Sequence, residues 1–136
     1  MYEFKEEFRT GIEEIDKEHE KLFDIANRIY ETMMDDFIPD KYDYILEIIN
    51  ELKEYAAVHF RNEEAYMVKV GYKKLFSQKI AHNKFAEKIG EYDLDYIDEN
   101  QKEVILDMME FVGDWLVKHI LESDKDIGDF VAQEGK

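Results

Sequence analysis

The sequence predicts an all-α fold, namely an up-down-up-down four-helix bundle preceded by an N-terminal arm. Apolar residues recur at helical spacing in four blocks, and each block carries charged residues on its opposite side. The 136 residues are enough for one domain with one core, while 6 glycines and 1 proline are too few for a turn-rich all-β protein. Because the links between the blocks are short, consecutive helices are expected to be antiparallel neighbours.

The first two predicted helices each present a narrow apolar stripe. The stripe of the first helix consists of Ile15, His19, Leu22, Ala26, Ile29 and Met33. The stripe of the second helix consists of Ile45, Ile48, Leu52, Tyr55, His59 and Tyr66. Residues 37–40, which contain the proline, form the expected link between them because proline interrupts a helix.

The last two predicted helices follow the same pattern. The third stripe consists of Leu75, Gln78, His82, Phe85 and Ile89. The fourth stripe consists of Ile105, Met108, Val112, Trp115 and His119. Residues 69–72 and 93–100 are the expected links before these two helices. Trp115 is expected to belong to the core of the bundle, given its size and its place in the stripe.

We expect a single domain over residues 1–136, with no internal repeat. Residues 1–14 form the mixed aromatic and acidic arm, and the bundle extends over about 15–124. Residues 125–136 are predicted to be a polar, poorly ordered tail.

The composition excludes several classes of function. With 34 acidic and 18 basic residues the formal charge is -16, so the surface would repel a nucleic-acid backbone. No apolar run reaches the roughly 18 residues that a membrane span needs. The first ten residues lack the basic and apolar segments of a signal peptide, so a cytoplasmic protein is expected. The absence of cysteine excludes disulfides, thiolate metal sites and thiol catalysis.

The four histidines lie on the apolar stripes of four different predicted helices. They are His19, His59, His82 and His119. One histidine on such a face is usually a hydrogen-bonded core residue, but burying four imidazoles without partners would cost a few kcal/mol each, roughly. A shared metal site would use their lone pairs, so the pattern favours metal binding.

Two carboxylates are candidates to complete this site. Glu63 follows His59 by four residues, so both side chains leave the same face of a helix. Asp124 follows His119 by five residues, which rotates it away from that face unless the helix loosens or ends there. Glu122, three residues after His119, is the competing candidate, and the periodicity does not choose between them.

Imidazoles and carboxylates without a thiolate suit iron, manganese or zinc. Six ligands are too many for one tetrahedral zinc, so two metal ions bridged by the carboxylates are the simplest interpretation. The Glu-x-x-His pairs of ferritin-like di-iron proteins are absent, because the residues three before each histidine are Asp16, Ala56, Lys79 and Leu116.

The motifs around the histidines resemble those of the hemerythrin and bacteriohemerythrin family. They are IDKEHEKLF at 15–23, HxxxE at 59–63, WLVKHI at 115–120 and HxxxxD at 119–124. The resemblance covers nearly the whole chain, from about Gly11 to Asp124. It implies a four-helix bundle with a non-haem di-iron centre that binds dioxygen reversibly.

The resemblance also implies a role for each ligand. His19 and His59 would hold the iron that binds oxygen, and the second iron would be held by His82 and His119. The bridges between two iron ions would be an oxo or hydroxo group, Glu63 and Asp124. The family pattern thus favours Asp124 over Glu122.

One position departs from the family pattern. The family has a histidine four residues before the one that corresponds to His82, and this chain has Gln78 there. The iron held by His82 and His119 would then have Gln78 as a weak amide ligand, have a water, or keep an open position. Alternatively, Gln78 is a hydrogen-bonded core amide.

Two classes of function follow from this interpretation. The first is reversible dioxygen carriage, storage or sensing in an apolar pocket, for which the lining candidates are Leu22, Phe60, Leu116 and Ile120. The alternative is a di-iron oxidase or peroxidase that reduces dioxygen or hydrogen peroxide, which the substitution at Gln78 would favour. No catalytic side chain is predicted. The expected partner is dioxygen or hydrogen peroxide with an unknown reductant, and the chain is expected to be a monomer or weak oligomer.

Overall fold

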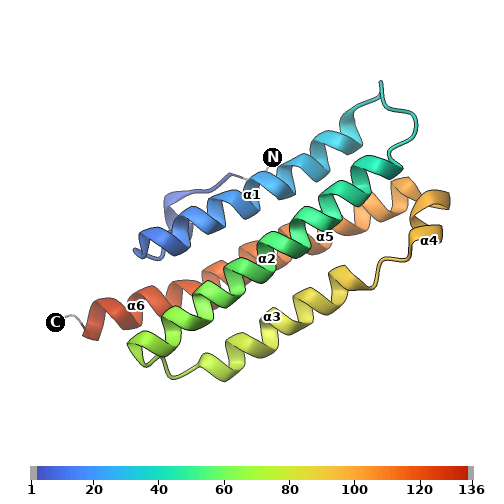
Figure 1. The fold of residues 1–136 in the computed structure, drawn as a ribbon. Helices are drawn as coiled ribbons and strands as arrows, with labels where there is room; N and C mark the ends of the chain where they lie inside the picture. Colours follow the sequence, from blue (N-terminus) through green and yellow to red (C-terminus); the bar gives the residue numbers. More distant parts are fainter. Residues whose placement is uncertain (1–2, 135–136) are drawn as a thin grey trace.

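The computed structural model describes residues 3–134, which form an all-α bundle (Figure 1). The four long helical segments run alternately up and down, and α1 packs against α2 and α5 while α2 also packs against α3. The helices are α1 (Glu13–Met34), α2 (Tyr42–Val70), α3 (Leu75–Gly90), α4 (Leu94–Glu99), α5 (Gln101–His119) and α6 (Lys125–Glu134). The predicted fold class is confirmed.

Two further segments are helical but not α-helical. A short 3-10 turn, η1 (Glu6–Phe8), interrupts the arm, and a π-helical turn, η2 (Ile120–Asp124), joins α5 to α6. In Figure 1, α5 and α6 therefore follow one another as parts of one long rod.

The turn between α2 and α3 depends on a glycine. Gly71 has a left-handed backbone with φ of 72°, which residues with a Cβ rarely adopt. The N–H of Tyr72 then donates to the carbonyl of Met67 at 2.9 Å, which closes the end of α2. This tight turn sets α3 antiparallel to α2 and brings its polar residues back toward Glu63.

Two segments are more ordered than the sequence indicates. The expected link over residues 93–100 contains the short helix α4, whose Ile97 is fully buried. The expected polar tail over 125–136 instead forms α6 through Glu134, while its last two residues lie outside the described part. Ile127 of α6 is fully buried against a cluster that includes Ile12, Ile15, Met67 and Tyr72. The tail prediction failed because these apolar partners lie far away in the sequence.

The N-terminal arm is hydrogen-bonded to the bundle through a buried carboxylate. Asp16 of α1 accepts hydrogen bonds from the backbone N–H of Thr10 at 2.8 Å, its hydroxyl at 2.9 Å and the N–H of Gly11 at 3.3 Å. The backbone of Thr10 also lies against Gly128 of α6, where a Cβ would be 1.9 Å from the Thr10 carbonyl oxygen. The arm therefore joins the first and last helices.

The apolar core of the described residues has two clusters along the helices, and a third, smaller cluster of Phe8, Phe23 and Ile120 packs the arm against the bundle. The larger cluster includes Leu22, Phe60 and Leu116, and the smaller one includes Ile15, Met67 and Ile127. On α1, His19 lies between Ile15 and Leu22, and the other polar core residues have the same intermediate position on their helices. The bundle thus holds one buried polar layer between two apolar clusters.

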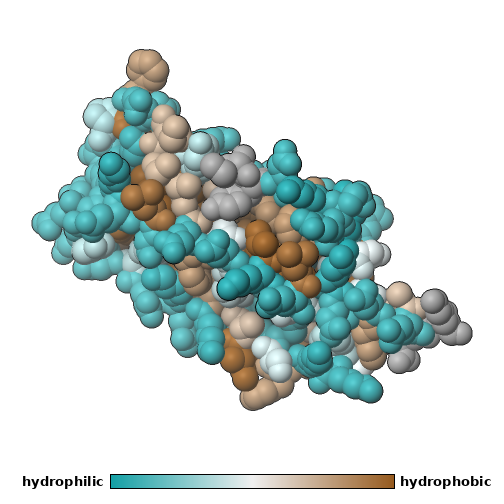
Figure 2. All heavy atoms as spheres, turned by 180° about the vertical axis from the view of Figure 1, so that it is seen from behind, coloured by the Kyte–Doolittle hydropathy of each residue, from teal (hydrophilic) through white to brown (hydrophobic). Residues whose placement is uncertain are grey.

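The face of the molecule seen in Figure 2 is mostly hydrophilic, with scattered apolar patches. Phe37 and Phe76 are the most exposed large apolar side chains among the described residues, at 96% and 76%. Over that same part of the chain, no helix combines the length and apolar character that crossing a bilayer requires.

Candidate metal centre

Six potential metal ligands converge in the polar layer from every long segment of the bundle. They are His19 on α1, His59 and Glu63 on α2, His82 on α3, His119 on α5 and Asp124 on η2. All six are buried, and Glu63 is fully buried. Charged side chains this deep require partners or a bound cation, because an unpaired buried charge is very costly.

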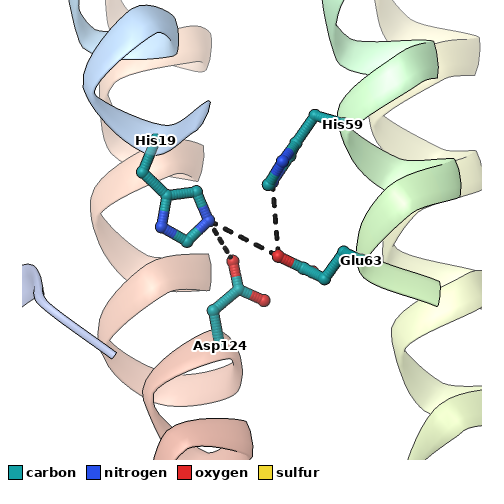
Figure 3. A group of neighbouring side chains, drawn as sticks. All are labelled: His19, His59, Glu63 and Asp124. Carbon is teal, nitrogen blue, oxygen red and sulfur yellow. Dashed lines mark ion pairs between the residues drawn. The ribbon is translucent and has the colours of Figure 1, made fainter. Parts of the chain in front are cut away.

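The first group of ligands combines α1, α2 and η2 (Figure 3). His19 Nε2 lies 3.0 Å from Asp124 Oδ2 and 3.5 Å from Glu63 Oε2. His59 Nε2 lies 3.3 Å from the same Glu63 oxygen. Two imidazole nitrogens and one oxygen of each carboxylate therefore face a common point.

The second group uses the remaining oxygens of the same two carboxylates. His82 Nε2 lies 3.1 Å from Glu63 Oε1, and His119 Nε2 lies 3.1 Å from Asp124 Oδ1. The two imidazole Nε2 atoms are 3.3 Å apart. Since Glu63 and Asp124 each give one oxygen to either group, they have the positions that two bridging carboxylates would have.

The π-turn explains how Asp124 reaches the site. The N–H of Lys125 donates to the carbonyl of Ile120, five residues back, instead of four. This wider turn brings the fifth residue after His119 onto the same face, whereas a regular α-helix would rotate it away. Asp124 is buried in the site and Glu122 is exposed. Of the two candidates that periodicity left open, Asp124 is therefore the one that lies beside the histidines.

The charges of these side chains are strongly coupled. Burial alone would raise the pKa of Glu63, but contacts with His19, His59 and His82 hold it well below its usual value. Burial alone would lower the pKa of His59, but the hydrogen bond with Glu18 and the ion pair with Glu63 raise it to about 10. In the metal-free protein the raised pKa of His59 favours a proton on its imidazole, which offsets the charge of Glu63, and a cation would replace that proton.

Two glutamates orient the imidazoles from outside the ligand groups. His59 Nδ1 donates to Glu18 Oε1 at 2.9 Å, and His82 Nδ1 donates to Glu64 Oε2 at 2.8 Å. Asn62 Nδ2 in turn donates to Glu18 Oε2 at 2.8 Å. These hydrogen bonds leave Nε2 of both histidines as the nitrogen that faces the site, which is the usual arrangement around metal-bound histidine.

Sequence reasoning missed both glutamates. Each is the immediate neighbour of a ligand, because Glu18 precedes His19 and Glu64 follows Glu63. Adjacent residues on a helix point about 100° apart, so such a neighbour faces the next helix instead of the site. The sequence does show an acidic residue directly beside a candidate ligand in both cases. It does not show which histidine on a neighbouring helix that residue would bind.

Several of the converging polar atoms have no good hydrogen bond within the site, which is the arrangement expected of atoms that bind a metal ion. His19 Nε2, Glu63 Oε2 and Asp124 Oδ2 converge but have no well-formed hydrogen bond to any described residue. Buried polar atoms without hydrogen bonds are rare in folded proteins. A set of imidazole nitrogens and carboxylate oxygens suits iron, manganese or zinc, so the residues present fit a metal centre.

Gln78 lies one helical turn before His82 and is also buried. Its Nε2 donates to Asp124 Oδ1 at 3.2 Å, so the amide is a hydrogen-bonded core group in this structure. Its Oε1 is buried and has no hydrogen-bond partner over the described residues.

The predicted pocket residues are all buried around the ligands. Leu22, Phe60 and Leu116 belong to the larger apolar cluster, and Phe60 stacks on His82 with ring centroids 4.0 Å apart. Ile120 instead packs with Phe8 of the arm and Phe23. Trp115 stacks on His119 at 4.4 Å and contacts the Phe85 ring at 4.5 Å, so it is part of the wall of aromatic rings on this side.

Comparisons with known proteins agree on one family. Residues 10–131 match the model of the hemerythrin HHE cation binding domain. The chain is 48% identical over 126 residues to a bacteriohemerythrin of Clostridium acetobutylicum, which covers 93% of this chain and 98% of that protein. It is 30% identical over 119 residues to a bacteriohemerythrin of Methylococcus capsulatus, with 88% and 87% covered.

A solved structure supports the same assignment. The crystal structure of a wild-type hemerythrin superposes with a TM-score of 0.78 at 31% identity, covering 95% of both chains. The fold, the buried cluster of histidines and carboxylates, and the sequence matches all agree. The chain therefore belongs to the hemerythrin family of iron-containing, oxygen-binding proteins.

Proposed function

We propose that this chain holds two iron ions, joined by an oxo or hydroxo bridge, and binds dioxygen reversibly. His19 and His59 would hold the oxygen-binding ion, while His82 and His119 would hold the other. The observation that carries the proposal is the division of the carboxylate oxygens, because Glu63 and Asp124 each face both ligand groups. When bound, the two ferrous ions supply the electrons that dioxygen accepts.

The chain's own side chains hold the centre in a fixed geometry. Glu18 and Glu64 accept hydrogen bonds from the Nδ1 atoms of His59 and His82, which fixes the orientation of both rings. The two carboxylates would offset part of the positive charge of the ions in the buried layer. Helices on all sides then limit changes in the spacing of the ligands.

The apolar side chains next to the ligands would keep water away from the oxygen site. Leu22, Leu116 and Ile120 are at most 2% exposed, and Phe60 is 7% exposed. Exclusion of water protects a bound oxidised species from hydrolysis and from loss of a reactive product. We assign these four residues to the lining of the oxygen pocket.

The optical spectrum of the iron-loaded protein tests this proposal. The protein is reduced without air, its spectrum is recorded, air is admitted, and vacuum is then applied. A carrier gains a visible charge-transfer band with air and loses it under vacuum over several cycles. Immediate and irreversible conversion to the oxidised form would instead indicate the alternative class, an oxidase or peroxidase, and would overturn reversible binding.

A further inference from the structure

A small recess lies at the surface beside the second ligand group. Its volume is about 140 Å³, and it is bordered by the α2–α3 turn, the start of α3 and the end of η2. The residues that matter here are Tyr72, Ser77, Gln78, Glu122, Ser123 and Asp126. Gln78 is the one among them that donates a hydrogen bond to a ligand of the candidate centre, Asp124.

The orientation of the Gln78 amide is fixed by charge. Nε2 faces the Asp124 carboxylate, since the reverse orientation would put two oxygens 3.2 Å apart. While this hydrogen bond persists, Oε1 is directed elsewhere and cannot replace the missing imidazole as a ligand. Gln78 is 97% buried, and this oxygen is itself buried without a partner among the described residues, so it is an unused acceptor for a small molecule that passes the rim of the recess.

The two ligand groups have the same donor set. Each combines two imidazole nitrogens with one oxygen from Glu63 and one from Asp124. Neither group therefore offers more protein ligands than the other, so two ions held there would leave the same number of positions to other ligands. In the family pattern a fifth imidazole would give the group of His82 and His119 one more ligand than the other group. Because this chain has Gln78 at that position, the two groups are equal.

From these observations we infer that the ion held by His82 and His119 has an exchangeable position for a small neutral ligand, reached through the recess beside Gln78. In the resting protein this ligand would be water, whose O–H would be accepted by Gln78 Oε1. The inference rests on the proposed function, since it requires the second ion to be present.

The charges of the recess favour a neutral ligand. Lys74, Glu122 and Asp126 border it, which gives one positive and two negative groups. Lys74 Nζ lies 3.4 Å from Asp126 Oδ2, and the Tyr72 hydroxyl donates to the same oxygen at 2.6 Å. The net negative charge disfavours anions, while a neutral molecule the size of water would enter without an electrostatic cost.

Nitric oxide is a suitable probe because it is small, neutral and binds ferrous iron. Protein loaded with two ferrous ions is titrated with nitric oxide without air, and binding is followed by optical and electron paramagnetic resonance spectra. The inference predicts that about two molecules bind per chain, and about one binds to Gln78→His, whose imidazole fills the position. One molecule bound by both proteins would overturn it.

The route of access is tested with a pair of matched variants on α3. Ser77→Phe narrows the recess, and Lys84→Phe places the same side chain at an exposed position two turns further on. Binding of nitric oxide is followed in time, with one phase expected for each ion. The inference predicts that Ser77→Phe slows binding at the ion held by His82 and His119 severalfold without changing binding at the other ion, and that Lys84→Phe changes neither rate. Equal rates in all three proteins would show that ligands do not pass through the recess.

These tests also separate the inference from the function on which it rests. Iron content and the reversible oxygen band are measured first on the same samples. If two ions are present and the band is reversible, a single nitric oxide molecule per chain contradicts only the exchangeable position. If the second ion is absent, the proposed function fails before the probe is added.

Discussion

At the scale of single residues, hydrogen bonds at Nδ1 of His59 and His82 orient the two rings so that Nε2 of each faces the candidate metal centre. Glu18 contacts His59 from α1, and Glu64 contacts His82 from α2, so each ring is held by a helix other than its own. Both glutamates are only partly buried, at 19% and 25% side-chain exposure. They can therefore keep their charge while they orient a buried ring.

Glu18→Gln should weaken metal binding without removing a ligand. An amide can present its NH₂ to His59 Nδ1 and so favour the wrong ring tautomer, and loss of such a partner typically lowers metal affinity by about 10–100-fold. A competition titration with a chelator measures this change. Glu31→Gln, at an exposed position on the same helix, is the control and should retain the affinity of the parent protein.

Leu116→Ala should speed autoxidation of the oxygenated protein while leaving its iron content nearly unchanged. Leu116 lies one turn before His119 and is 2% exposed, so its truncation opens space for water near the ligands. Large-to-small changes of this kind also cost about 2–5 kcal/mol of stability. Leu52→Ala, fully buried in the same cluster two turns from His59, is the control for stability loss alone. Equal autoxidation rates in these two variants would remove Leu116 from the pocket wall.

At the scale of elements, the π-turn is the feature that completes the centre. Sequence periodicity left Asp124 and Glu122 as alternatives because it assumes a regular α-helix, and nothing in Ile120–Asp124 marks a wider turn. The resemblance to the family favoured Asp124, and the structure gives the physical reason. The four histidine stripes, by contrast, were predictable because α1, α2, α3 and α5 are regular where the histidines lie.

Replacing the two competing carboxylates one at a time tests the role of this turn. Asp124→Asn removes the charge that faces both ligand groups, so it should abolish most binding of the metal pair. Glu122→Gln changes an exposed neighbour two residues away and should leave the metal content unaltered. Metal analysis of both purified proteins gives the answer, and the opposite order of losses would assign the ligand to Glu122.

The contact between the arm and α6 is the second feature that the sequence could not show. Thr10 and Gly128 lie at opposite ends of the chain, and only the folded bundle brings them together. Likewise, α6 was expected to be a poorly ordered tail because its apolar residues are few, and their partners lie at the start of α1, at the end of α2 and in the α2–α3 turn.

Gly128→Ala should therefore destabilise the protein more than an alanine substitution normally does. A Cβ at this position would meet the carbonyl oxygen of Thr10 at 1.9 Å, and moving backbone to relieve such overpacking typically costs about 1–3 kcal/mol. Gly90→Ala is the matched control, since a Cβ there meets nothing within 4 Å. Urea denaturation of the two variants compares their free energies of unfolding, and equal values would mean that the arm is readily displaced.

At the scale of the whole molecule, a polar layer lies between two apolar clusters in an acidic, four-helix domain. The clusters hold the helices together, while the layer between them gathers six candidate ligands of opposite charge tendencies, four imidazoles and two carboxylates. From the sequence, a shared metal site was predicted because each of the four histidines lies on the apolar stripe of a different helix. The sequence could not predict how the two carboxylates divide their oxygens, since that depends on the distances between four helices.

The iron content of the ferrous-loaded and desalted protein tests the central claim most directly. If Glu63 and Asp124 bridge two ligand groups, elemental analysis should find about two irons per chain, and His82→Ala should lower this value. A firm value of one iron per chain, unchanged by His82→Ala, would show that the second group binds no metal and would contradict the di-iron centre.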